Sequence, residues 1–160
     1  MKEQKTNVMR ILDQKKIPYR PHDYPHGEAP VDGATVAALL GQDPARVFKT
    51  LVSVGASRRY YVFDIPVLCE LDLKKAAKAV GEKSIAMIHV SEITPLTGYV
   101  RGGCSPIGMK KQFPTVLDRS ALAHDTICVS AGRIGAQVEL SPEDLLQLIR
   151  GTAADITVEE

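Results

Sequence analysis

A lysine stands in the middle of one of the most apolar stretches of the sequence. Residues 47–54 read VFKTLVSV, and this run of β-branched side chains predicts a strand. Alternation along that strand leaves both faces mainly apolar, which is typical of an interior strand. Because lysine is seldom buried without a partner, two interpretations of Lys49 stay open. Either its stem packs and its ammonium reaches water, or the ammonium sits in a pocket, as a ligand for a phosphate, carboxylate or carbonyl oxygen or as a base or nucleophile.

Two glycine-rich segments are the next candidates for chemistry. Residues 99–111 read YVRGGCSPIGMKK, which matches neither the phosphate-binding GxxxxGK[ST] loop nor the dinucleotide-binding GxGxxG turn. Glycines let the backbone approach a ligand, and consecutive amides can form a nest for an oxyanion or a carbonyl. The turn 130–135, SAGRIG, has the same character and adds the Ser130 hydroxyl. An ordinary tight loop has the same composition, so that interpretation also stays open.

The cysteine of the first segment, Cys104, is a candidate nucleophile only if a base lies near it. The four histidines are all distant in sequence, and none stands in a recognisable cysteine-hydrolase signature. A small packing residue is the commoner role for such a thiol. The three cysteines form no CxxC pair, so the pattern indicates neither a zinc site nor a redox dithiol and favours a reducing, cytoplasmic setting.

The elements that would position these residues alternate between α and β. A hairpin of strands at 47–54 and 60–65 is followed by an amphipathic helix over 71–81 and a strand-like stretch at 84–90. Pro21 predicts that the extended segment 19–24 is an edge strand. The remaining expected elements are helices at the start, at 35–41 and at 141–151, a helical turn at 91–98, and strands at 115–118, 126–130, 136–140 and 155–159.

Composition restricts the classes of protein that fit. The chain has 160 residues, 44% hydrophobic and 24% charged, as expected for one globular domain spanning 1–160. The sequence contains neither an apolar run long enough to span a membrane nor a recognisable signal peptide. The formal net charge of +1 means that any nucleic acid must bind through a local basic patch.

Three separated motifs resemble a known family. They are RVFKTLV at 46–52, TGYVRGGCSPIGMKK at 97–111, and VSAGRIGAQVEL at 129–140 followed by SPEDL. In this order and at this spacing they are similar to the YbaK/EbsC-type aminoacyl-tRNA deacylases, free-standing relatives of the editing domain inserted in bacterial prolyl-tRNA synthetase. The resemblance extends over nearly the whole chain, from KIPYRPHDYPH to the closing helix.

The resemblance implies an α+β fold with a mixed, mostly antiparallel, six- to seven-stranded barrel-like sheet and surrounding helices. It implies a trans-editing hydrolase that deacylates mischarged Cys-tRNA(Pro), with prolyl-tRNA synthetase as a partner and with no metal or organic cofactor. The synthetase mistakes cysteine for proline because the two are close in size. A hydrophobic pocket separates such isosteres poorly, so a second, editing site is needed.

Carried over position by position, Lys49 corresponds to the essential lysine of the family. The positions that match its pocket edge and its two substrate-facing loops are Tyr24, Thr50, Gly102, Gly103, Ser105, Pro106, Ser130 and Gly132. Two positions depart from the pattern. Cys104 stands where an aliphatic residue is expected, and Ile134 stands where many relatives carry a second basic residue.

The chemistry that the resemblance implies uses a thiol of the substrate. In these deacylases the cysteine of the mischarged tRNA is proposed to attack its own ester carbonyl, while the enzyme supplies positioning and electrostatics. We therefore expect Lys49 to neutralise the terminal phosphate or ribose end of the tRNA, and the loop 102–106 to hold the aminoacyl carbonyl. The candidates for tRNA contact are Arg101, Lys110, Lys111 and Arg133, with Lys74, Lys75, Lys78 and Lys83 further along; any of them is equally a solvated charge.

Three alternatives remain open. The substrate is another aminoacyl-tRNA(Pro), such as Ala-tRNA(Pro). The protein is a module that binds tRNA or the synthetase without catalysis. Or it is a cysteine hydrolase that uses Cys104.

Overall fold

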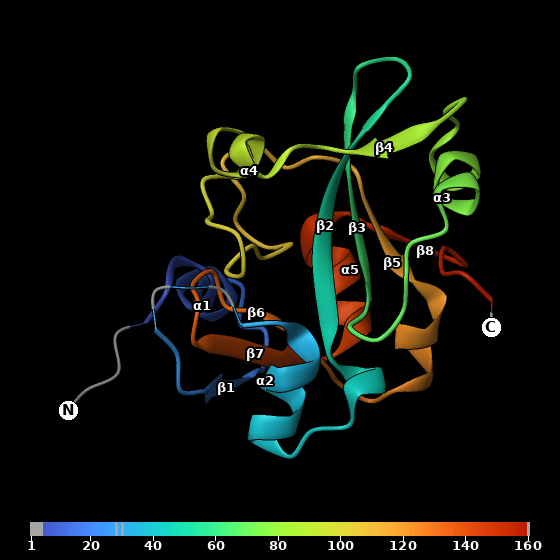
Figure 1. Ribbon diagram of the computed structural model, residues 1–160. Helices are drawn as coiled ribbons and strands as arrows, with labels where there is room; N and C mark the ends of the chain where they lie inside the picture. The colour runs from blue at the N-terminus through green and yellow to red at the C-terminus, as the bar shows by residue number, and fades with distance from the viewer. Residues whose placement is uncertain (1–4, 28, 30, 160) are drawn as a thin grey trace.

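The computed structural model describes residues 5–27, 29 and 31–159, which form helices and strands in alternation (Figure 1). The helices Asn7–Gln14, Gly33–Leu40, Leu73–Val80 and Pro142–Ile149 each begin at a side-chain cap; the Asp72 carboxylate, for example, accepts the Lys74 and Lys75 amides. The elements in chain order are α1 Asn7–Gln14, β1 Arg20–Asp23, α2 Gly33–Leu40, η1 Pro44–Arg46, β2 Phe48–Gly55, β3 Tyr60–Pro66, α3 Leu73–Val80, β4 Ile85–Met87, α4 Val90–Thr97, β5 Thr115–Asp118, η2 Arg119–Ala123, β6 Ile127–Ser130, β7 Ala136–Leu140, α5 Pro142–Ile149 and β8 Thr152–Ala154.

The strands form two sheets. The larger has the order β4-β2-β3-β5-β8, and the smaller has the order β1-β7-β6. Four of the six strand pairings are antiparallel, whereas β3–β5 and β5–β8 are parallel. The α+β class with mixed, mostly antiparallel pairing is therefore confirmed, with the difference that the strands divide between two sheets instead of closing into one.

Strand β2 lies where the two sheets meet, and part of its edge is unpaired. A parallel bridge joins Val47, just before β2, to Cys128 in β6. Pairing with β4 begins only at Ser53. Among the described strands, residues 48–51 of β2 therefore have a strand partner only on the β3 side. A short stretch of sheet edge is left open in the middle of the molecule, between β6 and β4 (Figure 1).

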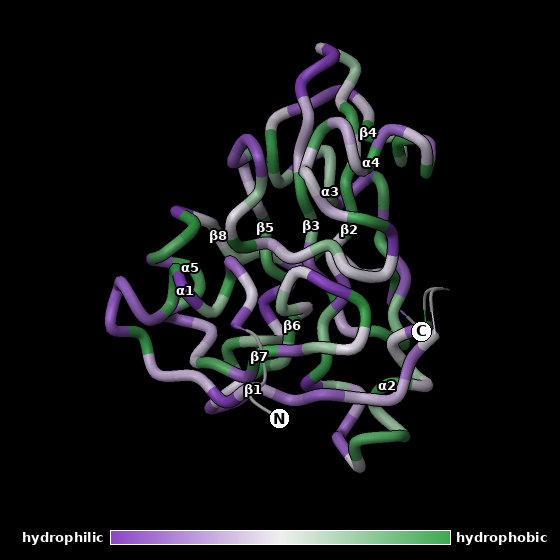
Figure 2. Tube along the Cα trace, turned by 90° about the vertical axis from the view of Figure 1, so that its left-hand side faces the viewer, coloured by the Kyte–Doolittle hydropathy of each residue, from purple (hydrophilic) through white to green (hydrophobic). Residues whose placement is uncertain are grey.

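Apolar packing holds each sheet on its own set of helices. Helices α1 and α5 pack on β6 and β7, where Leu12, Leu145 and Val138 are fully buried. Helix α3 packs on β3, against Phe63 and Ile65. Figure 2 shows hydrophobic segments along the central strands and hydrophilic residues in many of the outer turns.

The chain end and α4 differ from the expectation. The strand predicted at 155–159 is wrong: β8 lies at Thr152–Ala154, where it pairs with β5, and Ile156 donates its amide to the Asp118 carboxylate. The helical turn expected at 91–98 is a full helix, α4 at Val90–Thr97, and the Glu92 carboxylate accepts the His89 amide and caps its first turn. No helix of the described residues is both long enough and apolar enough to cross a membrane.

Candidate active site

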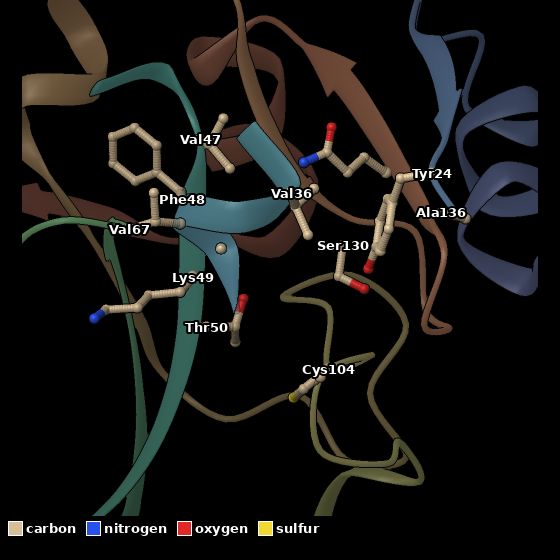
Figure 3. Close-up of a pocket in the computed structure, with 13 residues that line it drawn as sticks. Tyr24, Val36, Val47, Phe48, Lys49, Thr50, Val67, Cys104, Ser130 and Ala136 are labelled. Atoms are coloured by element: carbon tan, nitrogen blue, oxygen red, sulfur yellow. The ribbon is translucent and has the colours of Figure 1, made fainter. Parts of the chain in front are cut away.

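A small cavity lies at the open edge of β2. Its volume is about 170 Å³, below the roughly 300–1,000 Å³ typical of sites for drug-sized ligands. A space of this size suits the aminoacyl end of a substrate better than a whole nucleotide. Its lining comes from seven separate parts of the chain: Tyr24, Gly33, Val36, Val47, Phe48, Lys49, Thr50, Val67, Gly102, Cys104, Ser130, Ala136 and Gln137 (Figure 3).

Five of the predicted site residues meet in this cavity. They are Tyr24, Lys49, Thr50, Gly102 and Ser130. The sequence reasoning did not predict the apolar wall formed by Val36 and Val67, which come from α2 and the segment after β3. The one sequence feature that could have indicated this wall is Gly33. A Cβ at Gly33 would lie 2.2 Å from Val67 Cγ1, so a larger residue would keep α2 farther from Val67.

Lys49 is half-buried, with its stem along the cavity. It lies opposite Ile65 in β3, and in Figure 3 its ammonium extends away from Tyr24 and Ser130. The ammonium has no hydrogen bond or ion pair with any of residues 5–27, 29 or 31–159. It is thus a cation at the rim of the cavity, available to an anionic group that approaches from outside.

Thr50 points from β2 to the opposite face, toward the glycine-rich loop. The Thr50 hydroxyl donates a hydrogen bond to Asp64 Oδ1 at 2.5 Å. The two residues also lie directly opposite each other in the register of β2 and β3. Asp64 is fully buried, and desolvation raises its pKa to about 7, although the Thr50 hydrogen bond opposes that rise. The sequence reasoning missed Asp64, whose only signal was an acidic residue inside the apolar run YYVFDIP.

Cys104 lines the cavity as a neutral thiol. Burial, and then the nearby Asp64 charge, raise its pKa to about 12. The thiolate is the nucleophilic form of cysteine, so a thiol with this pKa is a poor nucleophile at neutral pH. No histidine is among the groups that shift the Cys104 pKa. The alternative of a Cys104 hydrolase therefore has neither an activated thiol nor a base.

The loop that carries Cys104 is held by its own side chains. The Ser105 hydroxyl accepts the Ile107 amide at 3.2 Å, and Ser105 and Pro106 are both buried. Neither lines the cavity, in contrast to Gly102. Gly103 lies against the second loop, where a Cβ would stand 2.9 Å from the Arg133 Cα. Ser105, Pro106 and Gly103 therefore shape the loop, and only Gly102 and Cys104 of the segment 102–106 face the cavity.

The second loop places a hydroxyl at the cavity. Ser130 ends β6, and its Oγ accepts the Gly132 amide at 3.1 Å. Gly132 has φ +99° and packs against Tyr99 instead of lining the cavity. Tyr24 is tied to the same loop, because its amide donates to the Gly135 carbonyl. In Figure 3 the Tyr24 and Ser130 hydroxyls point toward the same part of the cavity.

The predicted cationic residues are not equally available. Arg101 is exposed and lines a neighbouring hollow of about 300 Å³ that shares Thr50 and Gly102 with the cavity. Lys110 and Lys111 are exposed at the end of the loop. In contrast, Arg133 forms an ion pair with Asp23 at 3.4 Å. Of the lysines in and after α3, Lys75 is paired with Asp155 and Glu159, whereas Lys74, Lys78 and Lys83 are exposed.

One set of metal-ligating side chains lies on the other end of the small sheet. Among the described residues, His22, Cys128 and Glu139 have ligand atoms within 4.8 Å of one another. A hydrogen-bond network already uses these groups: His22 Nε2 lies 2.8 Å from one Glu139 oxygen, and Thr126 donates to the other. Burial and the Glu139 charge raise the Cys128 pKa to about 12, so the thiol is protonated there. These hydrogen bonds explain the positions of the His22 and Glu139 side chains as part of the structure.

Comparisons with known proteins identify relatives of this chain. Residues 30–148 match the sequence profile of the aminoacyl-tRNA editing domain family. A protein of Enterococcus faecalis (strain ATCC 700802 / V583) named as the Cys-tRNA(Pro)/Cys-tRNA(Cys) deacylase EbsC is 49% identical over 158 residues, which cover 99% of this chain and 96% of that protein.

Two crystal structures have the same fold. One, described as a hypothetical protein, has a TM-score of 0.85 and 25% identity over 96% of this chain and 100% of the other. The second, described as a trans-editing enzyme for prolyl-tRNA synthetase, has a TM-score of 0.81 and 24% identity over 98% of this chain and 100% of the other. The profile match and the near full-length relative show that the chain belongs to the aminoacyl-tRNA editing domain family.

Proposed function

We propose that this protein is a cytoplasmic trans-editing hydrolase that deacylates mischarged Cys-tRNA(Pro). The observation that carries the proposal is a cavity of amino-acid size with a free cation at its rim and no activated nucleophile in its lining. The near full-length relative named as a Cys-tRNA(Pro)/Cys-tRNA(Cys) deacylase supports the substrate class. The set of residues that lines the cavity fits a reaction in which the substrate supplies its own nucleophile.

In this proposal a cysteinyl ester reacts in two steps. The substrate sulfur attacks the ester carbonyl carbon, the new C–S bond closes a cyclic thioester, and the bond from carbon to the ribose oxygen breaks. The proton of the thiol ends on the ribose oxygen. Water then opens the cyclic thioester to free cysteine. Holding the thiol and the carbonyl in an attacking geometry is the main contribution that a site without a nucleophile can make.

The cavity residues take distinct parts in this proposal. Lys49 meets a terminal phosphate or the ribose end, because its ammonium points out of the cavity. Gly102 brings backbone close to the aminoacyl carbonyl, and Tyr24 and Ser130 supply hydroxyls on the opposite side. Val36 and Val67 form an apolar wall that suits a small side chain.

The test is deacylation of Cys-, Ala-, Ser- and Pro-tRNA(Pro), and of Cys-tRNA(Cys), by wild type and by Lys49→Ala. We expect wild type to act on the cysteinyl esters at least about 100-fold faster than on the alanyl ester, since alanine has no thiol. Lys49→Ala should lose about 100-fold or more, as removal of one electrostatic contact to a transition state typically does. The matched control is Lys15→Ala, which removes an exposed lysine outside the cavity and outside the predicted tRNA contacts and should retain wild-type rates.

The outcomes separate the alternatives. Equal rates on Ala- and Cys-tRNA(Pro) would refute the substrate-thiol step and favour the broader deacylase. Binding of tRNA without any deacylation would favour the non-catalytic module. An unchanged rate for Lys49→Ala would remove the basis for the assignment of the cavity.

We further propose that prolyl-tRNA synthetase delivers the tRNA. The net charge is only +1, and two of the predicted cationic contacts, Arg133 and Lys75, are held in ion pairs. Non-specific binding to a nucleic acid depends on free cations, so the protein alone should bind tRNA weakly. Adding a prolyl-tRNA synthetase that cannot edit should raise the deacylation rate at sub-saturating tRNA, and no change would count against this partner.

A further inference from the structure

A buried carboxyl lies directly behind the cavity and has no structural explanation. Asp64 is 0% exposed, and its Oδ2 has no hydrogen-bond partner among the described residues. Its Oδ1 accepts one hydrogen bond, from the Thr50 hydroxyl. Buried polar atoms normally have hydrogen-bond partners, so an unpaired carboxylate oxygen in an apolar strand points to a role other than packing.

Within the part of the chain that the structure describes, the surroundings of Asp64 offer packing but no compensating charge. Its strand neighbours Phe63 and Ile65 are fully buried apolar residues, and its register partner in β5 is the fully buried Leu117. The titratable group that faces it from the glycine-rich loop is the Cys104 thiol, which burial keeps neutral. A valine at this position would fill the same place without the cost of burying a carboxyl.

The other buried acid of the same sheet shows the contrast. Asp118 is 3% exposed, but both of its oxygens are used: Oδ1 accepts the Ile156 amide, and Oδ2 accepts the Ser120 amide and hydroxyl. Asp118 therefore fixes a turn and the chain end. Asp64 fixes only one group, the Thr50 hydroxyl.

That one hydrogen bond sets what the cavity presents to a ligand. A threonine hydroxyl has one donor hydrogen and two acceptor lone pairs. When the hydrogen is given to Asp64, the lone pairs remain for the cavity, which Thr50 lines. In Figure 3 the Thr50 oxygen points into the space between β2 and Ser130. Above pH 7, where Asp64 is ionised, the cavity thus presents an acceptor at Thr50 with a carboxylate directly behind it.

We propose that Asp64, acting through the Thr50 hydroxyl, selects substrates that carry a free α-ammonium group. The inference rests on the proposed deacylase function, because every aminoacyl ester has an ammonium next to its carbonyl. Asp64 does not touch the substrate, so it is a positioning residue that determines specificity. Esters whose α-nitrogen is acylated, such as peptidyl esters, lack the cation that the Thr50–Asp64 pair attracts and are spared.

The test uses two tRNA(Pro) esters of nearly equal size. One is the cysteinyl ester, and the other is its α-hydroxy analogue, in which a neutral hydroxyl replaces the ammonium and the thiol is kept. The measurement is the ratio of kcat/KM for the two esters with wild type, Asp64→Asn and Asp64→Val. Hydrogen bonds to charged groups are worth enough for wild type to prefer the ammonium ester by about 10- to 100-fold.

We expect both Asp64 variants to reduce this preference to within about 3-fold, mainly through a higher KM for the ammonium ester. Thr50→Val should do the same, whereas Thr50→Ser retains the hydroxyl and should retain the preference. Asp118→Asn removes a buried carboxyl outside the cavity and should leave the ratio unchanged. A change of packing alone would alter the rates of both esters together and leave their ratio unaltered.

Two results would overturn the inference. Wild type that deacylates both esters equally, or an Asp64→Asn protein that keeps the wild-type ratio, would show that Asp64 does not select the ammonium while the deacylase function stands. Wild type that deacylates neither ester would refute the deacylase function and this inference with it.

Discussion

Replacing Asp64 with asparagine should stabilise the protein, by an amount that depends on pH. An aspartate ionises with a pKa near 3.8 in an unfolded chain, whereas burial raises the pKa of Asp64 to about 7 in the fold. Below pH 4 the carboxyl is neutral in both states and carries no penalty. Between pH 4 and 7 the folded state holds a proton that the unfolded state has released, so stability falls as pH rises.

The size of the stability difference follows from the gap between the unfolded-state and folded-state pKa values of Asp64. Each pH unit costs about 1.4 kcal/mol, so the loss reaches about 4 kcal/mol above pH 7. An asparagine does not ionise and can still accept the Thr50 hydroxyl. Asp64→Asn should therefore match wild type near pH 4 and exceed its free energy of unfolding by about 4 kcal/mol at pH 8. Since domains are stable by roughly 5–15 kcal/mol, this is a large fraction of the total.

Urea unfolding followed by circular dichroism at pH 4.5, 6 and 8 measures these differences. Thr50→Val supplies a control of opposite sign, because it removes the hydrogen bond that lowers the Asp64 pKa and should extend the loss of stability to higher pH at the same slope. A constant difference between Asp64→Asn and wild type at all three pH values would refute the reasoning, since it would mean that Asp64 ionises equally well in both states.

Three further predictions concern the loops and α5. Cys104→Val should deacylate Cys-tRNA(Pro) within about 3-fold of wild type, because a thiol with a raised pKa is not the nucleophile; a loss of several orders of magnitude would contradict this. Gly103→Ala should lower kcat/KM about 10-fold or more, because its Cβ would push the two loops apart at Arg133, whereas Gly27→Ala, with nothing within 4 Å, should behave as wild type. Ser141→Ala removes the cap of α5 and should lower the free energy of unfolding by about 1 kcal/mol in urea titrations.

The sequence predicted the elements whose own residues determine their structure. The β-branched run around Lys49 forms β2, and the helix over 71–81 is present as α3. The sequence predicts a last strand at 155–159. In the fold, the open edge of β5 pairs with 152–154 instead. The position of β8 is determined by tertiary strand pairing, which local propensity does not predict.

The same limit applies to the cavity. Lys49, Thr50 and Gly102 lie in motifs that can be read along the chain, and all three line it. Asp64 could be connected to Thr50 only once the register of β2 and β3 was known. The apolar wall from Val67 depends on how α2 packs, which no local pattern gives.

The pairing of β1 with β7 has a consequence for biosynthesis. Residues 20–23 hydrogen-bond with 136–139, so the small sheet joins segments more than one hundred residues apart. Such distant pairings form late and slowly compared with local hairpins such as β2–β3. Tyr24 and Gln137 both line the cavity, one from each side of this pairing. A nascent chain therefore cannot have a complete cavity until ribosomal synthesis has passed β7, and a protein truncated before that point should have the β2–β3 hairpin but no site.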